Sequence, residues 1–247
     1  GLENATGDYI YFIDSDDYVE PAMLEEMYHK AKVSSADIVI ADYYVNYPQK
    51  QIYKKQVAPS TGTECARWIL SGRLHSSNSN KLIKRELYLN NNISFIEGIN
   101  MWEDMSTIAR ICYLANKVAY LPQAYLHYVQ YNSNSYTTNI TEKSLLDIQA
   151  VISILRDFFG QNNDYQQDLV FLTLKAKVDF IMHAKGDIRK KLCQLYNASR
   201  EMIIKHPSLS VFYKLLLLLE KHRLYGFIDI FIVLYFIAKK IALKVKK

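Results

Sequence analysis

The first third of the chain alternates short apolar runs with one amphipathic segment. Residues 8–13 form an apolar run that ends in acidic residues, which is typical of a buried strand of a parallel sheet. Pro21 suits the first turn of a helix, and apolar residues follow it at helical spacing as far as Ala31. Residues 37–41 form a second apolar run. The order strand, helix, strand is the unit of an open α/β sheet.

In the middle of the chain the apolar segments are shorter and are separated by polar residues. Residues 46–62 are polar and contain two prolines, so we expect a surface excursion there. The spacing of apolar residues predicts three short helices, over 63–71, 81–90 and 104–115. It also predicts three short strands, at 93–95, 117–121 and 124–129.

After about residue 140 the strand signal disappears. The remaining pattern predicts five helices, over 142–159, 165–185, 188–205, 208–222 and 226–245. The predicted fold class is therefore α/β, with an open Rossmann-like sheet in residues 1–140 and a helical region in residues 141–247.

Composition and charge narrow the possible functions. Half of the 247 residues are hydrophobic, which excludes a disordered chain. The net charge of +5 lies entirely in residues 239–247, which contain five lysines and no acid. A basic tail behind an apolar helix favours anionic lipid over nucleic acid, so we expect no nucleic-acid partner. Three widely spaced cysteines without a Cys-x-x-Cys pair indicate a reducing compartment.

The strongest chemical signal is the run Asp14-Ser15-Asp16-Asp17 at the end of the first predicted strand. Ligands of open α/β sheets bind beyond the carboxyl ends of strands. Carboxylates there suit Mg²⁺ or Mn²⁺, which would neutralise a diphosphate leaving group. The alternative is an acidic turn that caps the next helix. Spacing alone does not decide between the two.

Residues 1–19 resemble the central segment of family 2 glycosyltransferases, which have the GT-A fold. Asp14 and Asp16 match the two aspartates of the family's Asp-x-Asp motif, and Asp17 matches an additional acid common in one subgroup. The resemblance implies that these residues bind a divalent metal and a nucleotide-sugar donor. It also implies transfer of the sugar to a polysaccharide or lipid-linked saccharide.

Two further motifs resemble the bacterial polysaccharide-type members of this family. In residues 78–84, NSNKLIK, Lys81 is expected to meet a donor phosphate, with a solvated lysine as the alternative. In Trp102-Glu103-Asp104, Asp104 matches the general base of inverting members, and Glu103 is expected to orient it or the acceptor. Trp102 is expected to stack on an acceptor sugar, with a place in the core as the alternative. The alternative for the two acids is a pair stabilised by a helix N-terminus.

A fourth motif, Tyr125-Leu126-His127-Tyr128, leads to Asn134-Ser135-Tyr136-Thr137. It resembles the aromatic strand of the same subgroup, so we expect His127 and Tyr128 to bind the acceptor. A structural histidine is the alternative. Val129 or Gln130 stands where the subgroup usually has arginine, so no phosphate contact is predicted at that position.

The resemblance covers residues 1–138, whereas the family's domain begins earlier, with strands that hold the nucleotide base. We therefore expect those strands to be missing from this chain, which would leave a sheet edge uncovered. No residue of the chain can then be assigned to the donor base. A fragment with half a nucleotide site is expected to bind its donor poorly.

The end of the chain predicts contact with a membrane surface. Phe227–Ala238 is apolar except for Asp229, and its twelve residues would span about 18 Å as a helix, against about 30 Å for a bilayer core. An interfacial helix over residues 226–247, with its lysines at the headgroups, fits better. This places the protein in the cytoplasm, at the inner face of the cell membrane. The alternative is a helix packed on its own domain against Leu215–Leu219.

Two rival functions remain open from the sequence. One is a metal-dependent phosphoryl-transfer enzyme with Asp14 as nucleophile. The other is a non-catalytic, membrane-associated remnant whose acidic residues are only structural.

Overall fold

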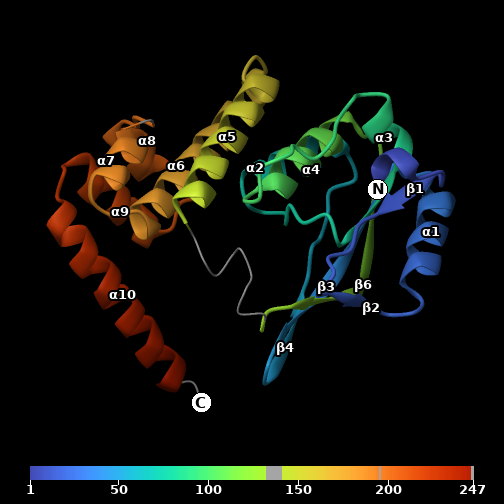
Figure 1. The fold of residues 1–247 in the computed structure, drawn as a ribbon, viewed down its shortest axis with the longest axis horizontal. Coiled ribbons are helices and arrows are strands. Elements are labelled where there is room, and N and C mark those ends of the chain that lie inside the picture. Colours follow the sequence, from blue (N-terminus) through green and yellow to red (C-terminus); the bar gives the residue numbers. More distant parts are fainter. Residues whose placement is uncertain (132–140, 195, 246–247) are drawn as a thin grey trace. The chain divides into compact units, whose positions relative to one another are not determined.

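The computed structural model describes residues 1–131, 141–194 and 196–245. Contacts divide the chain into a first unit, Gly1–Asn139 with Ala150–Leu169, and a second unit, Ile140–Gln149 with Val170–Lys247. The first unit is built on a six-stranded sheet, and the second is helical (Figure 1). The predicted α/β class, an open sheet followed by a helical region, is confirmed.

The sheet is mostly antiparallel around one long parallel pair. In spatial order its strands are β1 (Tyr9–Tyr11), β5 (Lys81–Lys84), β3 (Ile38–Tyr47), β6 (Val118–Val129) and β2 (Tyr18–Val19), and β4 (Lys50–Lys54) pairs with the second half of β3. Among the described strands only β3 and β6 run parallel. β1 therefore lies at one edge and pairs with β5 alone within the described chain.

Both units contain helices. The first unit contains η1 (Leu2–Asn4), α1 (Met23–Ser34), α2 (Gly62–Leu70), α3 (Arg85–Leu89), α4 (Glu103–Leu114) and η2 (Asn163–Tyr165). The second contains α7 (Gly186–Gln194), α8 (Arg200–Lys205), α9 (Val211–Lys221) and α10 (Tyr225–Val245). Two helices contribute residues to both units, α5 (Glu142–Phe159) and α6 (Gln166–His183).

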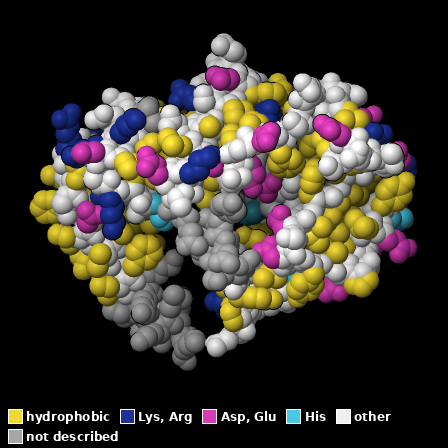
Figure 2. Space-filling view, in the orientation of Figure 1, with side chains coloured by type: hydrophobic (Ala, Val, Ile, Leu, Met, Phe, Trp, Pro, Cys, Tyr) yellow, Lys and Arg dark blue, Asp and Glu magenta, His cyan; other side chains and the backbone are white. Residues whose placement is uncertain are grey.

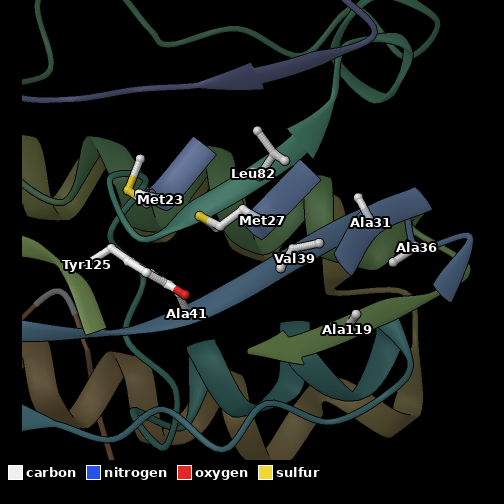
Figure 3. Close-up of a cluster of buried hydrophobic side chains, with 9 residues drawn as sticks. All are labelled: Met23, Met27, Ala31, Ala36, Val39, Ala41, Leu82, Ala119 and Tyr125. Atoms are coloured by element: carbon white, nitrogen blue, oxygen red, sulfur yellow. The ribbon is translucent and has the colours of Figure 1, made fainter. Parts of the chain in front are cut away.

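Helix α1 covers one face of the sheet through a stripe of small and flexible side chains. Met23, Met27 and Ala31 recur every four residues and are buried against β3, β5 and β6 (Figure 3). Their partners are Val39, Ala41, Leu82, Ala119 and Tyr125, together with Ala36. Because four members of this cluster are alanines, the helix backbone can lie close to the sheet.

A left-handed residue ends α1 and returns the chain into the sheet. Ser35 has φ 52°, and the N–H groups of Ser35 and Ala36 bond to carbonyl oxygens in the last turn of the helix. β3 begins three residues later and is buried along its first six residues. A strand covered on both faces explains why residues 37–41 are uniformly apolar from Ile38 onward.

Helices α2 and α4 lie on the other side of the sheet from α1 (Figure 1). They pack so tightly that a Cβ atom on Gly62 would lie 2.0 Å from the Cys112 carbonyl oxygen and 2.2 Å from that of Ala115. Cys112 and Cys193 are buried free thiols and act as small apolar side chains.

Tertiary pairing overturned several local predictions. Residues 81–90 were expected to form one helix, but Lys81–Lys84 forms β5, which pairs with both β1 and β3. The excursion at 46–62 contains β4, and residues 93–95 form no strand. β1 was expected in a parallel sheet, but it runs antiparallel to β5. In each case partners distant in sequence decide the conformation.

Other boundaries shifted for identifiable reasons. The two strands expected around Pro122 form the single strand β6, because register shifts opposite Ala41 and Asp42 accommodate the missing proline N–H. The helix expected over 188–205 is divided into α7 and α8. β2, which was not predicted, consists of two residues paired with β6.

Substituting Gly62 tests the close contact between α2 and α4. We expect Gly62→Ala to lower the free energy of unfolding by about 3 kcal/mol, because the added Cβ would overlap two backbone carbonyls that cannot rotate away. Urea unfolding measures this difference. Gly226→Ala in α10 is the control, since no atom lies within 4 Å of its added Cβ. Equal stability of Gly62→Ala and the wild type would contradict the packing.

Candidate active site

The acidic run forms the loop between β1 and β2. The Asp17 N–H donates to the Asp14 carbonyl oxygen over 3.1 Å and closes the turn. Asp17 Oδ1 accepts a hydrogen bond of 2.9 Å from the Val129 N–H, which attaches the loop to the end of β6. Asp14 and Asp16 are exposed, whereas Asp17 is half-buried. Asp17 therefore anchors the loop that presents the other two carboxylates.

Ionisation of this loop is unfavourable. The pKa of Asp17 is raised to about 6: burial is the largest cause, the Val129 hydrogen bond opposes it, and the charges of Asp14 and Asp16 add to it. Burial and the neighbouring Asp16 also raise the pKa of Asp14. Asp17 Oδ2 is buried and has no hydrogen-bond partner among the described residues. This is the electrostatic environment that a cation would relieve.

Asp104 lies in the first turn of α4, close enough to the acidic loop to interact with it. Its Oδ2 accepts a hydrogen bond of 3.2 Å from the Asn78 N–H. The pKa of Asp104 is raised to about 6: burial is the largest cause and the charge of Asp14 adds to it, while Asn78 and Lys81 oppose it. The structure thus brings Asp14 and Asp104, ninety residues apart in sequence, into one electrostatic site.

Trp102 and Glu103 begin α4 immediately before Asp104. Trp102 is the N-cap residue and adopts a left-handed conformation, with φ 62° and ψ 17°. A tryptophan in this region is strained by about 1–3 kcal/mol, and such strain is concentrated at functional sites. All three side chains of the predicted Trp-Glu-Asp motif are half-buried, so each retains some contact with solvent.

Lys81 occupies a different environment from the one predicted. It is the first residue of β5 and is fully buried. Its ammonium group donates to the His75 carbonyl oxygen at 2.9 Å, the Ser77 carbonyl oxygen at 2.5 Å and Asn80 Oδ1 at 2.8 Å. An ammonium group has three protons, so in this arrangement none remains for the expected phosphate contact.

His127 is enclosed by its neighbours on one face of the sheet. Its ring stacks on Tyr18 of β2 and Tyr44 of β3, with centroid distances of 4.3 and 5.0 Å. Nδ1 lies 3.2 Å from amide nitrogens of Asn46 and Gln51, so it acts as an acceptor and Nε2 donates to Glu20. Both ring nitrogens are occupied, which gives His127 a structural role in this arrangement.

Tyr128 points to the opposite face of β6 because adjacent strand residues alternate. It packs with Tyr43, Val45 and Leu126. His127 and Tyr128 therefore do not form one acceptor surface. The continuation of their motif, Asn134-Ser135-Tyr136-Thr137, lies outside the described residues.

Sequence comparison agrees with this geometry. The sequence model described as "Glycosyl transferase family 2" matches residues 1–90, which include the acidic loop and Lys81. A cholesterol galactosyltransferase of Borreliella burgdorferi is 30% identical over 171 residues, covering 63% of this chain and 47% of that protein. Residues 1–90 of the chain therefore carry a glycosyltransferase family 2 domain.

The chain is also similar to a second curated glycosyltransferase and to a solved structure. Glycosyltransferase GlyG of Streptococcus pneumoniae is 26% identical over 191 residues, covering 72% of this chain and 59% of that protein. The chain spans about half the length of the curated relatives it matches. The S. aureus TarS 1-349 structure in complex with UDP-GlcNAc has a TM-score of 0.60 at 17% identity. The match covers 94% of this chain and 66% of the TarS chain, which confirms the GT-A type of fold.

The acidic loop of this family 2 domain fits a divalent cation only in part. Asp14 and Asp16 offer hard carboxylate oxygens, which Mg²⁺ and Mn²⁺ prefer. No cluster of three or more His, Cys, Asp or Glu side chains suited to a metal occurs within the described ranges. The loop therefore suits an ion that takes its remaining ligands from water or a bound diphosphate.

Sequence reasoning missed three residues that shape the site. Asn78 holds Asp104 through its backbone, and the Tyr11 hydroxyl donates to the Ser79 carbonyl oxygen. The buried Tyr88 hydroxyl has no hydrogen-bond partner in the part of the chain that the structure describes. The electrostatic influence of Asp104 reaches Tyr88, and that of Asp14 and Asp17 reaches Tyr11. Asn78 opens the NSNKLIK motif, but backbone contacts leave no mark in a sequence.

Asp17→Asn tests the strain in the acidic loop. The raised pKa means that the folded protein binds more protons than the unfolded chain between about pH 4 and 6, so Asp17 lowers stability as pH rises through that window. Allowing for solvent screening, we expect Asp17→Asn to be up to about 1 kcal/mol more stable at pH 7.

Urea unfolding at pH 7 and pH 4 measures this effect, which should disappear at the lower pH. Asp157→Asn, at an exposed position of α5, is the control. A destabilised Asp17→Asn variant at pH 7 would show instead that the charge-assisted bond to Val129 outweighs the burial of the carboxylate.

Proposed function

We propose that this protein transfers a sugar from a nucleotide-sugar donor to a hydroxyl of a saccharide or lipid-linked acceptor, with inversion at the anomeric carbon. The observation that carries the proposal is the electrostatic proximity of Asp14 and Asp104. One carboxylate belongs to the predicted donor loop and the other to the predicted base motif. A sugar-transfer site needs both functions near the bond that is broken.

Asp104 is suited to the role of general base. With a pKa of about 6 it is ionised at neutral pH and still basic enough to accept a proton from an acceptor hydroxyl. As that proton moves to Asp104, the acceptor oxygen forms a bond to the anomeric carbon on the face opposite the diphosphate. The bond from the anomeric carbon to the diphosphate oxygen breaks, and the nucleoside diphosphate leaves. A single displacement of this kind inverts the configuration.

Asp14 and Asp16 are the residues that would hold Mg²⁺ or Mn²⁺. The bound ion would neutralise negative charge on the diphosphate leaving group. The raised pKa values of Asp14 and Asp17 support this assignment, because they indicate a loop in which negative charge is not yet compensated.

The relatives suggest where to begin with substrates. TarS was crystallised with UDP-GlcNAc, and the Borreliella relative is described as a cholesterol galactosyltransferase. We therefore propose a UDP-linked sugar as the first donor to test and an acceptor that is lipid-borne or saccharide. Trp102 and Tyr128 remain the proposed acceptor contacts, and Glu103 remains the proposed partner of Asp104.

Calorimetry and a transfer assay separate donor binding from catalysis. We expect Mn²⁺-dependent binding of a UDP-sugar that is lost in Asp16→Ala and retained in Asp104→Asn. We expect Asp104→Asn to lower kcat by about 10²–10⁴-fold. Asp157→Asn is the control for removal of a surface carboxylate. The protein is tested both as this chain and with any residues that precede Gly1 in the gene product.

Other outcomes of this experiment have defined meanings. Donor binding that does not depend on the metal would remove the proposed role of Asp14 and Asp16. Full activity of Asp104→Asn would remove the proposed base. A phosphate trapped on Asp14, without sugar transfer, would favour the phosphoryl-transfer alternative.

Helix α10 supports a membrane-surface location. Its inner side packs on α9, where Phe231 and Tyr235 stack on Phe212 at centroid distances of 5.4 and 3.6 Å. Its exposed side carries four apolar side chains that are 57–62% exposed, Phe227, Ile230, Val233 and Leu234. Figure 2 shows hydrophobic side chains gathered along this helix. The helix therefore packs on its own unit, which was the alternative to an interfacial helix in the sequence analysis. It still presents an apolar surface to solvent.

The sequence of α10 continues from this apolar surface into lysines, at Lys239, Lys240 and Lys244. Apolar side chains followed by basic residues suit the interface of an anionic membrane. No helix in the described part of the chain has both the length and the apolar composition to cross a bilayer. We therefore propose that residues 226–247 lie at the inner face of the cell membrane, next to a lipid-linked acceptor.

Vesicle flotation tests this location. We expect the full chain to float with vesicles of anionic lipid, less with zwitterionic vesicles, and less at high salt. The triple variant Phe227→Ser, Ile230→Ser, Val233→Ser should lose at least about tenfold in partitioning, because each exposed apolar side chain contributes more than about 1 kcal/mol on burial. A triple serine variant at Leu24, Val33 and Leu89, exposed apolar residues of the first unit, is the control. Unchanged flotation of the α10 variant would contradict the proposal.

A further inference from the structure

Lys81 is one of the most buried side chains of the protein. Its exposed fraction is 0%, and burial lowers its pKa to about 8, so the ammonium group is still charged at neutral pH. It forms no ion pair within the described part of the chain, where its three acceptors are two carbonyl oxygens and one side-chain amide oxygen. Burying a cation without a direct ion-pair partner is costly, although the charge of Asp104 partly stabilises it. The contacts it makes must therefore matter to the structure around it.

Those contacts close the segment between α2 and β5 into a fixed loop. The ammonium group donates hydrogen bonds to the carbonyl oxygens of His75 and Ser77 and to the side chain of Asn80. Asn80 is buried in turn and donates from Nδ2 to the Ala41 carbonyl oxygen of β3 at 2.9 Å. The Lys81 N–H also donates to the Asn78 carbonyl oxygen at 3.1 Å. The loop is therefore held from inside by one side chain and attached to the sheet.

The same loop contacts both parts of the candidate active site. The Asn78 N–H donates to Asp104 Oδ2 at 3.2 Å. The Ser79 carbonyl oxygen accepts from the hydroxyl of Tyr11, whose pKa is raised by burial and by the charges of Asp17 and Asp14. Displacing the loop would therefore move the Asn78 N–H group, whose hydrogen bond orients Asp104.

We propose that Lys81 is a positioning residue for Asp104: its buried ammonium group holds residues 75–80 in the conformation that directs the Asn78 N–H at the Asp104 carboxylate. The inference rests on the proposed role of Asp104 as general base. It replaces the expected contact between Lys81 and a donor phosphate. It also explains why a lysine stands at the start of a buried strand, where an apolar residue would be less costly.

Lys81→Met tests the proposal, with Lys177→Met as a matched control. Lys177 is also buried, at 6% exposed, and also donates to a carbonyl oxygen, that of Tyr196, but it lies in the second unit and pairs with Glu220. Both variants remove one buried ammonium group and keep the length of the side chain. Both should lower the melting temperature.

Two readouts distinguish positioning from general destabilisation. Hydrogen exchange of the Asn78 amide, followed by NMR in the full chain, should accelerate by at least about tenfold in Lys81→Met and remain unchanged in Lys177→Met. In the transfer assay, kcat of Lys81→Met should fall by at least about tenfold, while KM for the donor changes by less than about twofold. An increased KM with unchanged kcat would instead support direct contact with the donor and overturn the proposal.

A second variant covers the case in which Lys81→Met does not fold. Lys81→Ala leaves a cavity of the shape of propylammonium, and adding n-propylammonium should restore Asn78 protection and kcat, whereas 1-propanol should not. Equal effects of the two additives, or wild-type Asn78 exchange in a folded Lys81 variant, would overturn the proposal. If the wild type transfers no sugar, the proposed function fails, but the exchange measurement still decides whether Lys81 orders the loop.

Discussion

The architecture depends on the need to satisfy the backbone hydrogen bonds of one buried strand. β3 is covered on both faces, so its N–H and C=O groups have no access to water and must pair along both edges. β6 takes one edge in parallel, and β5 and β4 share the other at different heights. The pairing with β5 places residues 75–80 beside the sheet, and the pairing with β6 places Val129 where it binds Asp17. Both halves of the site thus derive from the register of β3.

The site concentrates groups whose ionisation the fold opposes. Asp14, Asp17 and Asp104 all have raised pKa values, and Lys81 has a lowered one, with burial as the largest cause for each. A protein selected for stability alone would avoid such a combination. Together with the left-handed Trp102, it marks the region where local stability is lost in favour of chemistry. The match of residues 1–90 to glycosyltransferase family 2 includes Asp14, Asp17 and Lys81 of this region.

The two units carry different kinds of surface. The first presents exposed carboxylates at the end of β1, suited to a cation and a phosphorylated donor. The second presents an apolar helix side followed in sequence by lysines, suited to an anionic lipid interface.

The sequence by itself determined the kinds of elements and the chemistry of the motifs. Apolar periodicity located α1, α2, α4, α5, α6, α9 and α10, and the acidic run and the Trp-Glu-Asp motif indicated the family, because these signals are local. Only the tertiary structure decided that Lys81 begins a strand and lies buried, that both nitrogens of His127 are occupied, and that Tyr128 faces away from it. Strand pairing, burial and backbone hydrogen bonds join residues distant in the chain. No local pattern of residues records those partners.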